Sequence, residues 1–194
     1  MKYTCMFYEG VVSPEICNRL IARFDEENYK PGLIGGVNNA ILAKDIRDAD
    51  RQWANKNDLV ECILTRFIMQ ANKEALWNFD ITEPEQVQIG RYRENQFYGQ
   101  HMDCHIKGSD IVMTGRESAV VIPLLSQRKI SASLLLNDES EYEGGDLIIL
   151  NETVKPKKQG TIIVFPSFMA HQVTPVTRGI RYSAVCWMLG PKWK

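Results

Sequence analysis

The sequence has neither an excess of charge of one sign nor a long apolar run. Its 194 residues include 23 Lys or Arg and 24 Asp or Glu, a formal net charge of -1. We therefore expect no broad basic surface for nucleic acid or an anionic membrane. No apolar run approaches the roughly 20 residues that span a bilayer. The beginning of the sequence also lacks the pattern of a signal peptide, so we expect a soluble, cytoplasmic protein.

Cysteine is scarce and shows no pattern. The five cysteines are odd in number, widely spread and without a Cys-x-x-Cys pair. This argues against a disulfide framework or a structural zinc site and fits a reducing cytosol. Internal repeats and low-complexity tracts are also absent. With 44% apolar and 24% charged residues, the composition predicts a single globular domain over residues 1–194.

Residues 1–83 have mainly helical spacing. Ser13 and Pro14 are a suitable start for one helix, and a longer helix is expected over residues 57–77. Residues 31–40 hold too many Gly, Pro and Asn for a regular element and predict a loop. The apolar stripe expected to be buried on the longer helix is Leu59, Ile63, Phe67, Ala71 and Ala75.

From about residue 84 the pattern changes to short strand-like runs separated by turn residues. The expected strands are residues 87–92, 118–123, 129–136, 146–150, 161–165 and 181–188, with a turn at residues 143–146. Helical support over residues 1–83 and strands over 84–194 predict an α+β, mainly β fold. We expect a sandwich or barrel backed by N-terminal helices.

The whole chain has only three histidines: His101, His105 and His171. On a strand, His101 and Asp103 would point to the same face. With His171 from another strand they would form a two-histidine, one-carboxylate triad, which suits iron(II) and leaves positions open for a cosubstrate and dioxygen. The alternative for an isolated His-x-Asp is a surface turn. His105 would start roughly 13 Å from His101 on an unbroken strand, so we interpret it as a loop residue.

Arg181 follows His171 by ten residues, in a run predicted to be a strand. Arg181, Ser183 and Trp187 would share a face, which points inward in a barrel. A buried guanidinium is costly unless an anion compensates it, and its fork of donors suits a carboxylate. The alternative is a structural ion pair with Asp or Glu. Arg178, nearer a turn, and the basic stretch 155–158 are expected in solvent.

Several stretches match one family in sequence and spacing: residues 91–92, 98–103, 136–137, 142–147, 160–165, 171–176 and 181–187. Together they resemble the prolyl-hydroxylase-like branch of the 2-oxoglutarate and iron(II)-dependent oxygenases, and also the bacterial PKHD-type hydroxylases. The resemblance covers roughly residues 84–190 and implies a double-stranded β-helix. It implies that His101, Asp103 and His171 bind iron, that Arg181 binds the distal carboxylate of 2-oxoglutarate, and that Tyr92 lies near the cosubstrate.

The resemblance also implies further pocket residues, and the sequence departs from the family pattern at two positions. Trp187 occupies the family's tryptophan position, and Tyr98 shortly precedes the metal motif. Tyr92 and Tyr98 could each equally be part of an aromatic core. Leu135 stands where some prolyl hydroxylases have a tyrosine that helps to hold the distal carboxylate, so Ser133 and Ser183 are candidate replacements. Asn95 stands where glycine is frequent, and asparagine tolerates left-handed backbone angles.

The implied reaction is oxidative decarboxylation of 2-oxoglutarate to succinate, coupled to hydroxylation of a C–H bond by O2, with ascorbate as the expected reductant. The first substrate hypothesis is a prolyl residue in a protein or peptide, and the second is a free amino acid or another small molecule. A third hypothesis, from another class, is a catalytically silent barrel that binds metal or a partner and acts as a binding module. Residues 31–51 and 106–127 are candidate lids or substrate loops.

Overall fold

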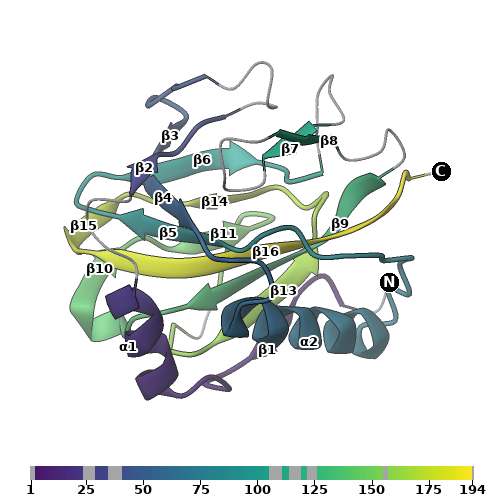
Figure 1. Ribbon diagram of the computed structural model, residues 1–194. Helices are drawn as coiled ribbons and strands as arrows, with labels where there is room; N and C mark the ends of the chain where they lie inside the picture. The colour runs from purple at the N-terminus through teal and green to yellow at the C-terminus, as the bar shows by residue number, and fades with distance from the viewer. Residues whose placement is uncertain are drawn as a thin grey trace.

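The computed structural model describes residues 3–23, 29–34, 41–104, 111–113, 119–121, 126–154 and 157–193, with backbone alone at 111–113 and 119–121. Two antiparallel sheets face each other, and two α-helices cover the outer face of the larger sheet (Figure 1). This arrangement is the expected mainly β fold, a double-stranded β-helix. Among the described residues, no helix has the length and apolar character needed to cross a membrane.

The larger sheet contains seven strands in the spatial order β1-β13-β9-β16-β5-β4-β2. Its centre is the long pair of β9 and β16, in which Ser131 lies opposite Trp187 and Leu135 opposite Ser183. The bounds of its strands are β1 Met6–Tyr8, β13 Ile162–Pro166, β9 Ser126–Leu135, β16 Arg181–Pro191, β5 Gln88–Tyr92, β4 Asp50–Trp53 and β2 Lys30–Pro31.

The smaller sheet contains five strands in the order β12-β11-β14-β6-β3, and two further strand pairs flank the sheets. Its strands are β12 Glu152–Thr153, β11 Leu147–Ile149, β14 His171–Val173, β6 Phe97–His101 and β3 Arg47–Asp48. The flanking pairs are β10 Tyr142–Gly144 with β15 Val176–Gly179, and β7 Ile111–Met113 with β8 Ala119–Val121. A short 3-10 helix occupies Glu139–Glu141.

Both predicted helices are present. α1 spans Pro14–Arg23 and α2 spans Leu59–Glu74, where the Asp58 side chain accepts a hydrogen bond from the Val60 amide and caps the first turn. The predicted stripe on α2 is confirmed at Ala71 and Ala75, which are fully buried, but its first residue, Leu59, is 57% exposed. Apolar residues stand side by side at three successive turns of α2, and the helix buries the second residue of each pair: Val60, Leu64 and Ile68.

The first third of the chain holds strands as well as helices. β1 extends the larger sheet beside β13, β4 pairs with β5, and β3 pairs with β6. These strands have only two to four residues, too few for period-two alternation to stand out in the sequence. The expected turn at residues 143–146 is present, with φ of +70° at Gly144 and +57° at Gly145, but it connects strands of different sheets.

Strand alternation separates two apolar cores. Ile130, Ala132 and Leu134 of β9 belong to the core beneath the helices, whereas Leu135 belongs to the core between the sheets. The opposite face of β9, between the two sheets, carries Ser131 and Ser133, which are 1% and 7% exposed. Buried hydroxyl groups there, in place of aliphatic side chains, mark the part of the fold in which the candidate site lies.

Candidate active site

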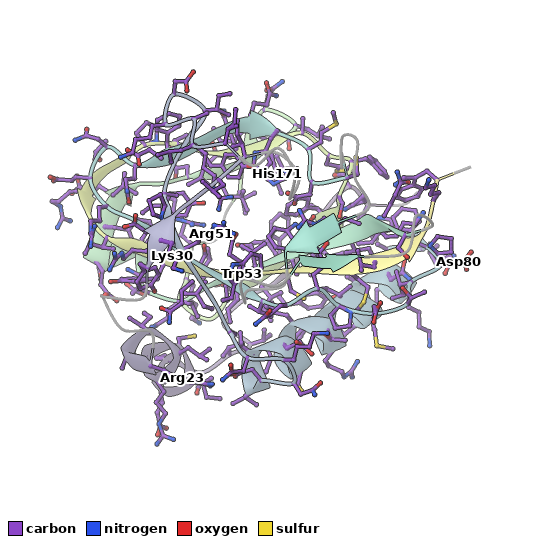
Figure 2. The ribbon with its side chains drawn as sticks, turned by 45° about the horizontal axis from the view of Figure 1, so that its top comes forward. Arg23, Lys30, Arg51, Trp53, Asp80 and His171 are labelled. Atoms are coloured by element: carbon purple, nitrogen blue, oxygen red, sulfur yellow. The ribbon has the colours of Figure 1, made fainter. Side chains whose placement is uncertain are left out.

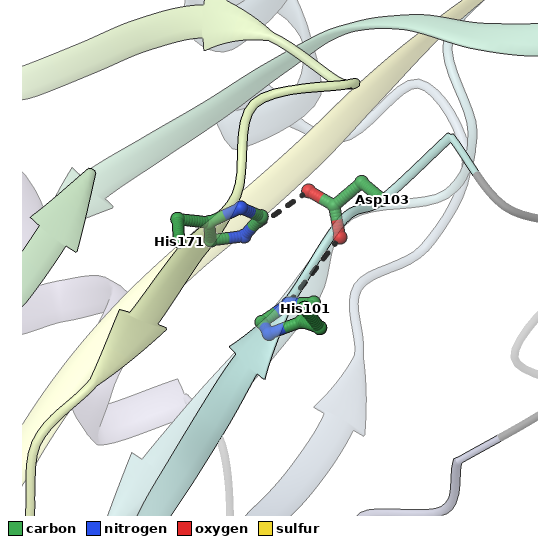
Figure 3. Close-up of side chains that lie close together, drawn as sticks. All are labelled: His101, Asp103 and His171. Carbon is green, nitrogen blue, oxygen red and sulfur yellow. Dashed lines mark ion pairs between the residues drawn. The ribbon is translucent and has the colours of Figure 1, made fainter. Parts of the chain in front are cut away.

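His101, Asp103 and His171 come together between the sheets (Figure 3). β6 ends at His101 and β14 begins at His171, and strand pairing puts these two residues directly opposite each other. Asp103 lies in the turn after β6. One ligand atom from each residue lies within 4.8 Å of the other two, and no other such group occurs among the described residues. The structure therefore assembles the predicted trio, although from a strand end and a turn rather than from one unbroken strand.

Backbone contacts fix which nitrogen of each histidine faces the centre. Nδ1 of His101 lies 2.8 Å from the Gly99 carbonyl, and Nδ1 of His171 lies 2.9 Å from the Met169 carbonyl. A carbonyl oxygen only accepts, so each Nδ1 carries the proton and each Nε2 presents its lone pair to Asp103. Burial lowers the pKa of His171, which keeps its imidazole neutral as a metal ligand must be.

The spacing of these atoms fits a shared metal ion. Nε2 of His101 lies 3.6 Å from Oδ1 of Asp103, and Nε2 of His171 lies 3.5 Å from Oδ2. Two ligands at right angles, each about 2.1 Å from one ion, are roughly 3 Å apart. Burial by itself would raise the pKa of Asp103, but His171 and His101 in their protonated forms, together with the Arg128 guanidinium, outweigh it and hold that pKa well below its usual range. The carboxylate is therefore ionised and ready to bind a cation.

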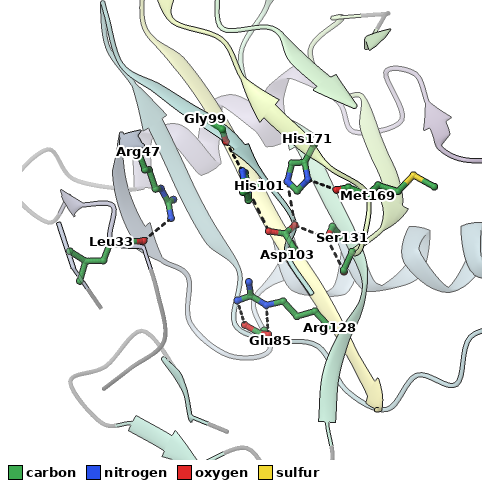
Figure 4. Close-up of polar contacts among 11 residues, drawn as sticks. Leu33, Arg47, Glu85, Gly99, His101, Asp103, Arg128, Ser131, Met169 and His171 are labelled. Atoms are coloured by element: carbon green, nitrogen blue, oxygen red, sulfur yellow. Dashed lines mark hydrogen bonds and ion pairs between the residues drawn. The ribbon is translucent and has the colours of Figure 1, made fainter. Parts of the chain in front are cut away.

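Two serines that the sequence pattern did not indicate hold Asp103 in place, and Figure 4 shows one of them, Ser131, beside the carboxylate. The Ser131 hydroxyl donates to Oδ2 of Asp103 at 2.7 Å and lies 2.9 Å from the Ser167 hydroxyl. The Ser167 carbonyl accepts hydrogen bonds from the amides of Asp103 and Cys104 at 2.9 and 3.0 Å. The inward position of Ser131 on a predicted strand was the only sequence signal for this role.

Tyr98 and Arg128 flank the trio. The Tyr98 ring stacks on His101, with centroids 3.6 Å apart and an interplanar angle of 12°. Burial raises the pKa of Tyr98 and keeps its phenol protonated. Arg128 makes a two-pronged ion pair with Glu85, at 2.6 and 2.7 Å (Figure 4). Its guanidinium also lies over the Trp187 ring, 3.9 Å from the centroid. Trp187 is therefore on the inner face as expected, where it packs against a cation.

A second feature between the sheets is a pocket around Arg181. It is lined by Leu135, Tyr142, Gly145, Leu147, Val154, Lys157, Ile163 and Arg181. Arg181 is 2% exposed, its Nη1 donates to the Ser183 hydroxyl at 3.1 Å, and its Nε has no hydrogen-bond partner among the described residues. A Cβ at Gly145 would lie 2.8 Å from Cδ of Arg181, so the glycine gives the arginine its space.

The pocket supports some sequence expectations and corrects two. Tyr92 is buried beneath Arg181, whose guanidinium lies 5.4 Å from the ring centroid, and Ser183 contacts Arg181 directly. Ser133 lies on the inner face but does not line the pocket. Lys157 was expected in solvent and instead lines the pocket, where its ammonium pairs with Asp146. Lys157 lies in a loop, where side chains do not alternate as they do on a strand, so the sequence could not predict the direction of its side chain.

Some predicted features lie outside the described residues. They are His105, most of the loop 106–127 and residues 35–40 of the candidate lid 31–51. Arg178 is exposed as expected and pairs with Glu143 at 2.9 Å. Asn95 has a φ of +66°, the left-handed conformation that asparagine was expected to tolerate there.

The side chains of the trio and of the pocket suit the two groups that the resemblance implies, iron(II) and a carboxylate. Two neutral imidazoles and an ionised carboxylate on one side of an ion form the facial arrangement of non-haem iron(II) sites. The buried, uncompensated Nε of Arg181 and the ammonium of Lys157 suit a carboxylate in an otherwise apolar pocket. The fold and these two features define a class of protein, the double-stranded β-helix with a facial metal triad and an anion pocket.

Comparison with known sequences places the chain within that class. The sequence profile of the 2OG-Fe(II) oxygenase superfamily matches residues 87–189, slightly more than half of the chain, and the protein belongs to this superfamily. A PKHD-type hydroxylase of Xylella fastidiosa (strain M23) is 38% identical over 103 residues, which are 52% of this chain and 42% of that protein. The PKHD-type hydroxylase YbiX of Shigella boydii is 26% identical over 187 residues, 92% of this chain and 75% of the relative.

Solved structures support the same fold. A prolyl-4-hydroxylase of Pseudomonas putida superposes with a TM-score of 0.68 at 19% identity, covering 98% of this chain and 94% of that one. The viral collagen prolyl hydroxylase of Paramecium bursaria Chlorella virus-1, solved with 2-oxoglutarate, has a TM-score of 0.67 at 21% identity and covers 97% of both chains. At these identities the likeness concerns the fold.

Proposed function

We propose that this protein is an Fe(II)- and 2-oxoglutarate-dependent dioxygenase that hydroxylates a prolyl residue in a protein or peptide. The observation that carries the proposal is the convergence of His101, Asp103 and His171 on one point, with Arg181 buried on the inner face of the same two sheets. Structural packing alone would not require two imidazole lone pairs and a carboxylate to face one another at 3.5–3.6 Å. Membership of the 2OG-Fe(II) oxygenase superfamily supports iron(II) and 2-oxoglutarate as the groups that these residues would bind.

The chain's own residues position the reactants. Backbone carbonyls hold His101 and His171 in the tautomer that binds metal through Nε2, and Ser131 orients the carboxylate of Asp103. Iron(II) bound there would supply the activation of O2 and the oxidation of 2-oxoglutarate to succinate. Ascorbate is the expected reductant that keeps the metal in its ferrous state.

Arg181 would bind the distal carboxylate of 2-oxoglutarate, with Tyr92 beneath its guanidinium and Ser183 fixing Nη1. Lys157 would be a second donor to that carboxylate while its ammonium stays paired with Asp146, in the pocket where Leu135 departs from the tyrosine of some prolyl hydroxylases. The apolar walls formed by Leu135, Leu147 and Ile163 exclude water and strengthen these charge interactions.

The substrate part of the proposal is supported by the named neighbours. Three of them are prolyl hydroxylases by name, and the one from Trichoplax adhaerens, with a TM-score of 0.63 at 14% identity, was solved with a peptide fragment. The alternative substrate is a free amino acid or another small molecule. Mass spectrometry separates the two: proline-containing peptides or free proline and lysine would gain one oxygen atom.

The test of the reaction class is succinate formation from 2-oxoglutarate with iron(II) and ascorbate, for the wild type and for His101→Ala. We expect succinate from the wild type and loss of at least about a hundredfold in the variant, since three ligands are reduced to two. Arg19→Gln, on the exposed face of α1, is the matched control and should behave as wild type. Thermal unfolding of each protein distinguishes a lost metal site from a lost fold. Equal succinate formation by His101→Ala would refute the proposal.

A further inference from the structure

Two arginines lie on the inner face apart from both features described above: Arg47 of β3 and Arg51 of β4. Side chains point alternately to opposite sides along these short strands, so that Arg47, Ala49, Arg51 and Trp53 share one side of the chain. Ala49 belongs to the apolar core between the sheets, which identifies this side as the inner one. Neither arginine lines the pocket around Arg181.

Asp48 and Asp50, which are adjacent to these arginines in the sequence, do not neutralise them, because side chains alternate along the chain and the two aspartates point to the other side. Asp48 pairs with Lys44 at 3.6 Å. Asp50 pairs with Arg91 at 3.0 Å and with a second arginine, Arg93, at 3.2 Å. Both carboxylates next to Arg47 and Arg51 are therefore engaged elsewhere.

Arg47 and Arg51 have no carboxylate partner within the described part of the chain. Nη1 of Arg47 donates to the Leu33 carbonyl at 3.3 Å, and the guanidinium of Arg51 lies 5.5 Å from the Trp53 ring centroid. The Nε atoms of both arginines are buried without a hydrogen-bond partner in the same part of the structure. Burial, together with the nearby charge of Arg47, lowers the pKa of Arg51 to about 10. Buried guanidinium groups on one side of the chain are costly without an anion, and one bound anion would offset the charge of both.

The location connects this pair with the metal triad. The guanidinium of Arg47 lies 4.5 Å from the centroid of Tyr98, and Tyr98 in turn stacks on His101. A Cβ on Gly32 would lie 2.6 Å from Nε of Arg47, so a glycine leaves the room that this buried arginine needs. Figure 2 shows Arg51 and Trp53 on β4 in the central part of the molecule, in which His171 also lies, and Figure 4 shows Arg47 beside the triad.

We propose that Arg47 and Arg51 together bind a carboxylate of the substrate, next to the metal and separate from the carboxylate site at Arg181. This inference rests on the proposed function, since it names the class of substrate that the same active site accepts. A guanidinium pair with free Nε donors suits a planar carboxylate better than a neutral amide. The carboxylate belongs either to an acidic side chain near the target residue of a peptide or to the α-carboxylate of a free amino acid.

The test is direct observation of the arginine Nε–H signals by nitrogen-15 NMR, on full-length protein loaded with zinc(II) and saturated with 2-oxoglutarate. Zinc prevents turnover, and bound 2-oxoglutarate occupies the Arg181 pocket. The probes are acetate against acetamide, then acetyl-Ala-Pro-Asp-amide against its Asn counterpart, and L-proline against L-prolinamide. Arg47→Lys and Arg51→Lys assign the two signals.

We expect acetate, but not acetamide, to shift the signals of Arg47 and Arg51 while that of Arg181 stays in place. Either the Asp peptide or L-proline should then half-saturate at a concentration at least tenfold below its neutral counterpart, and that probe identifies the source of the carboxylate. Arg51→Gln should raise this concentration at least tenfold, equivalent to about 1.4 kcal/mol, whereas the exposed Arg19→Gln should not.

Three results would overturn the assignment: no response to acetate, a response to acetate but to neither larger probe, or equal binding by Arg51→Gln and wild type. The second result would mean a site for small anions only. Because nothing here depends on turnover, a failed succinate assay combined with these shifts would reject the proposed reaction without removing the carboxylate site. Normal succinate formation without the NMR shifts would support the proposed reaction and reject the carboxylate site at Arg47 and Arg51.

Discussion

Ser131 is the most informative residue to change, because its hydroxyl contacts the proposed metal ligand Asp103 without touching the metal position. The residue is 1% exposed and donates to Oδ2 of Asp103 at 2.7 Å. Ser131→Ala removes this hydrogen bond, of the kind worth roughly 1.5–3 kcal/mol when one partner is charged. It also leaves the Ser167 hydroxyl without its 2.9 Å neighbour. The carboxylate is then free to rotate away from the position that faces both histidines.

We expect Ser131→Ala to weaken metal affinity about 10- to 100-fold, the usual effect of losing a group that orients a ligand. Tenfold weaker binding removes about 1.4 kcal/mol of the stabilisation that excess metal gives to the folded state. In a domain of this size that corresponds to a melting temperature lower by roughly 3–6 °C in the presence of metal.

The assay is an anaerobic titration with iron(II) or manganese(II), followed by thermal unfolding with and without metal. Ser133→Ala is the matched control, because Ser133 lies two residues along the same inner face of β9 and has no hydrogen bond to Asp103 among the described contacts. Unchanged metal affinity in Ser131→Ala, or an equal loss in Ser133→Ala, would refute the argument that Ser131 positions the carboxylate.

Three further predictions concern the pocket and the histidines. Arg181→Gln should weaken 2-oxoglutarate binding at least tenfold in calorimetry while metal affinity is retained, since it removes the charge and leaves the triad intact; equal affinities would reject Arg181 as the carboxylate site. Gly145→Ala should lower the free energy of unfolding by more than about 1 kcal/mol in urea titrations, because φ is +57° and the new Cβ would approach Arg181 to 2.8 Å; a neutral effect would contradict this. Burial lowers the pKa of His171, so the unfolded chain binds a proton that the metal-free fold does not. Stability without metal should therefore fall as pH drops below about 6.5, and His171→Asn should flatten that dependence.

The sequence predicted the features that strong local patterns encode. Runs rich in β-branched or other apolar residues located β9, β13 and β16, and the i, i+2 spacing of His101 and Asp103 directed attention to the correct turn. Arg181 could be predicted to point inward because alternation along a strand is a strict geometric rule.

Other features were not predictable because they depend on tertiary packing. β3 and β4 are short and rich in Arg and Asp, and they are strands only because β6 and β5 offer free edges to pair with. Lys157 comes from a loop, where no periodicity fixes which way a side chain points. The phase of α2 was ambiguous because adjacent apolar pairs define two overlapping stripes, and only packing against the sheet selects one.

The measurement that tests the central claim most directly is the fate of the oxygen atoms when iron-loaded wild type and Asp103→Ala turn over 2-oxoglutarate under oxygen-18 gas. A dioxygenase reaction at the triad predicts succinate from the wild type that carries one oxygen atom derived from the gas. Asp103→Ala, which loses the carboxylate that faces both histidines, should form at least about a hundredfold less of it. Unlabelled succinate from the wild type, or labelled succinate formed equally well by Asp103→Ala, would contradict the account.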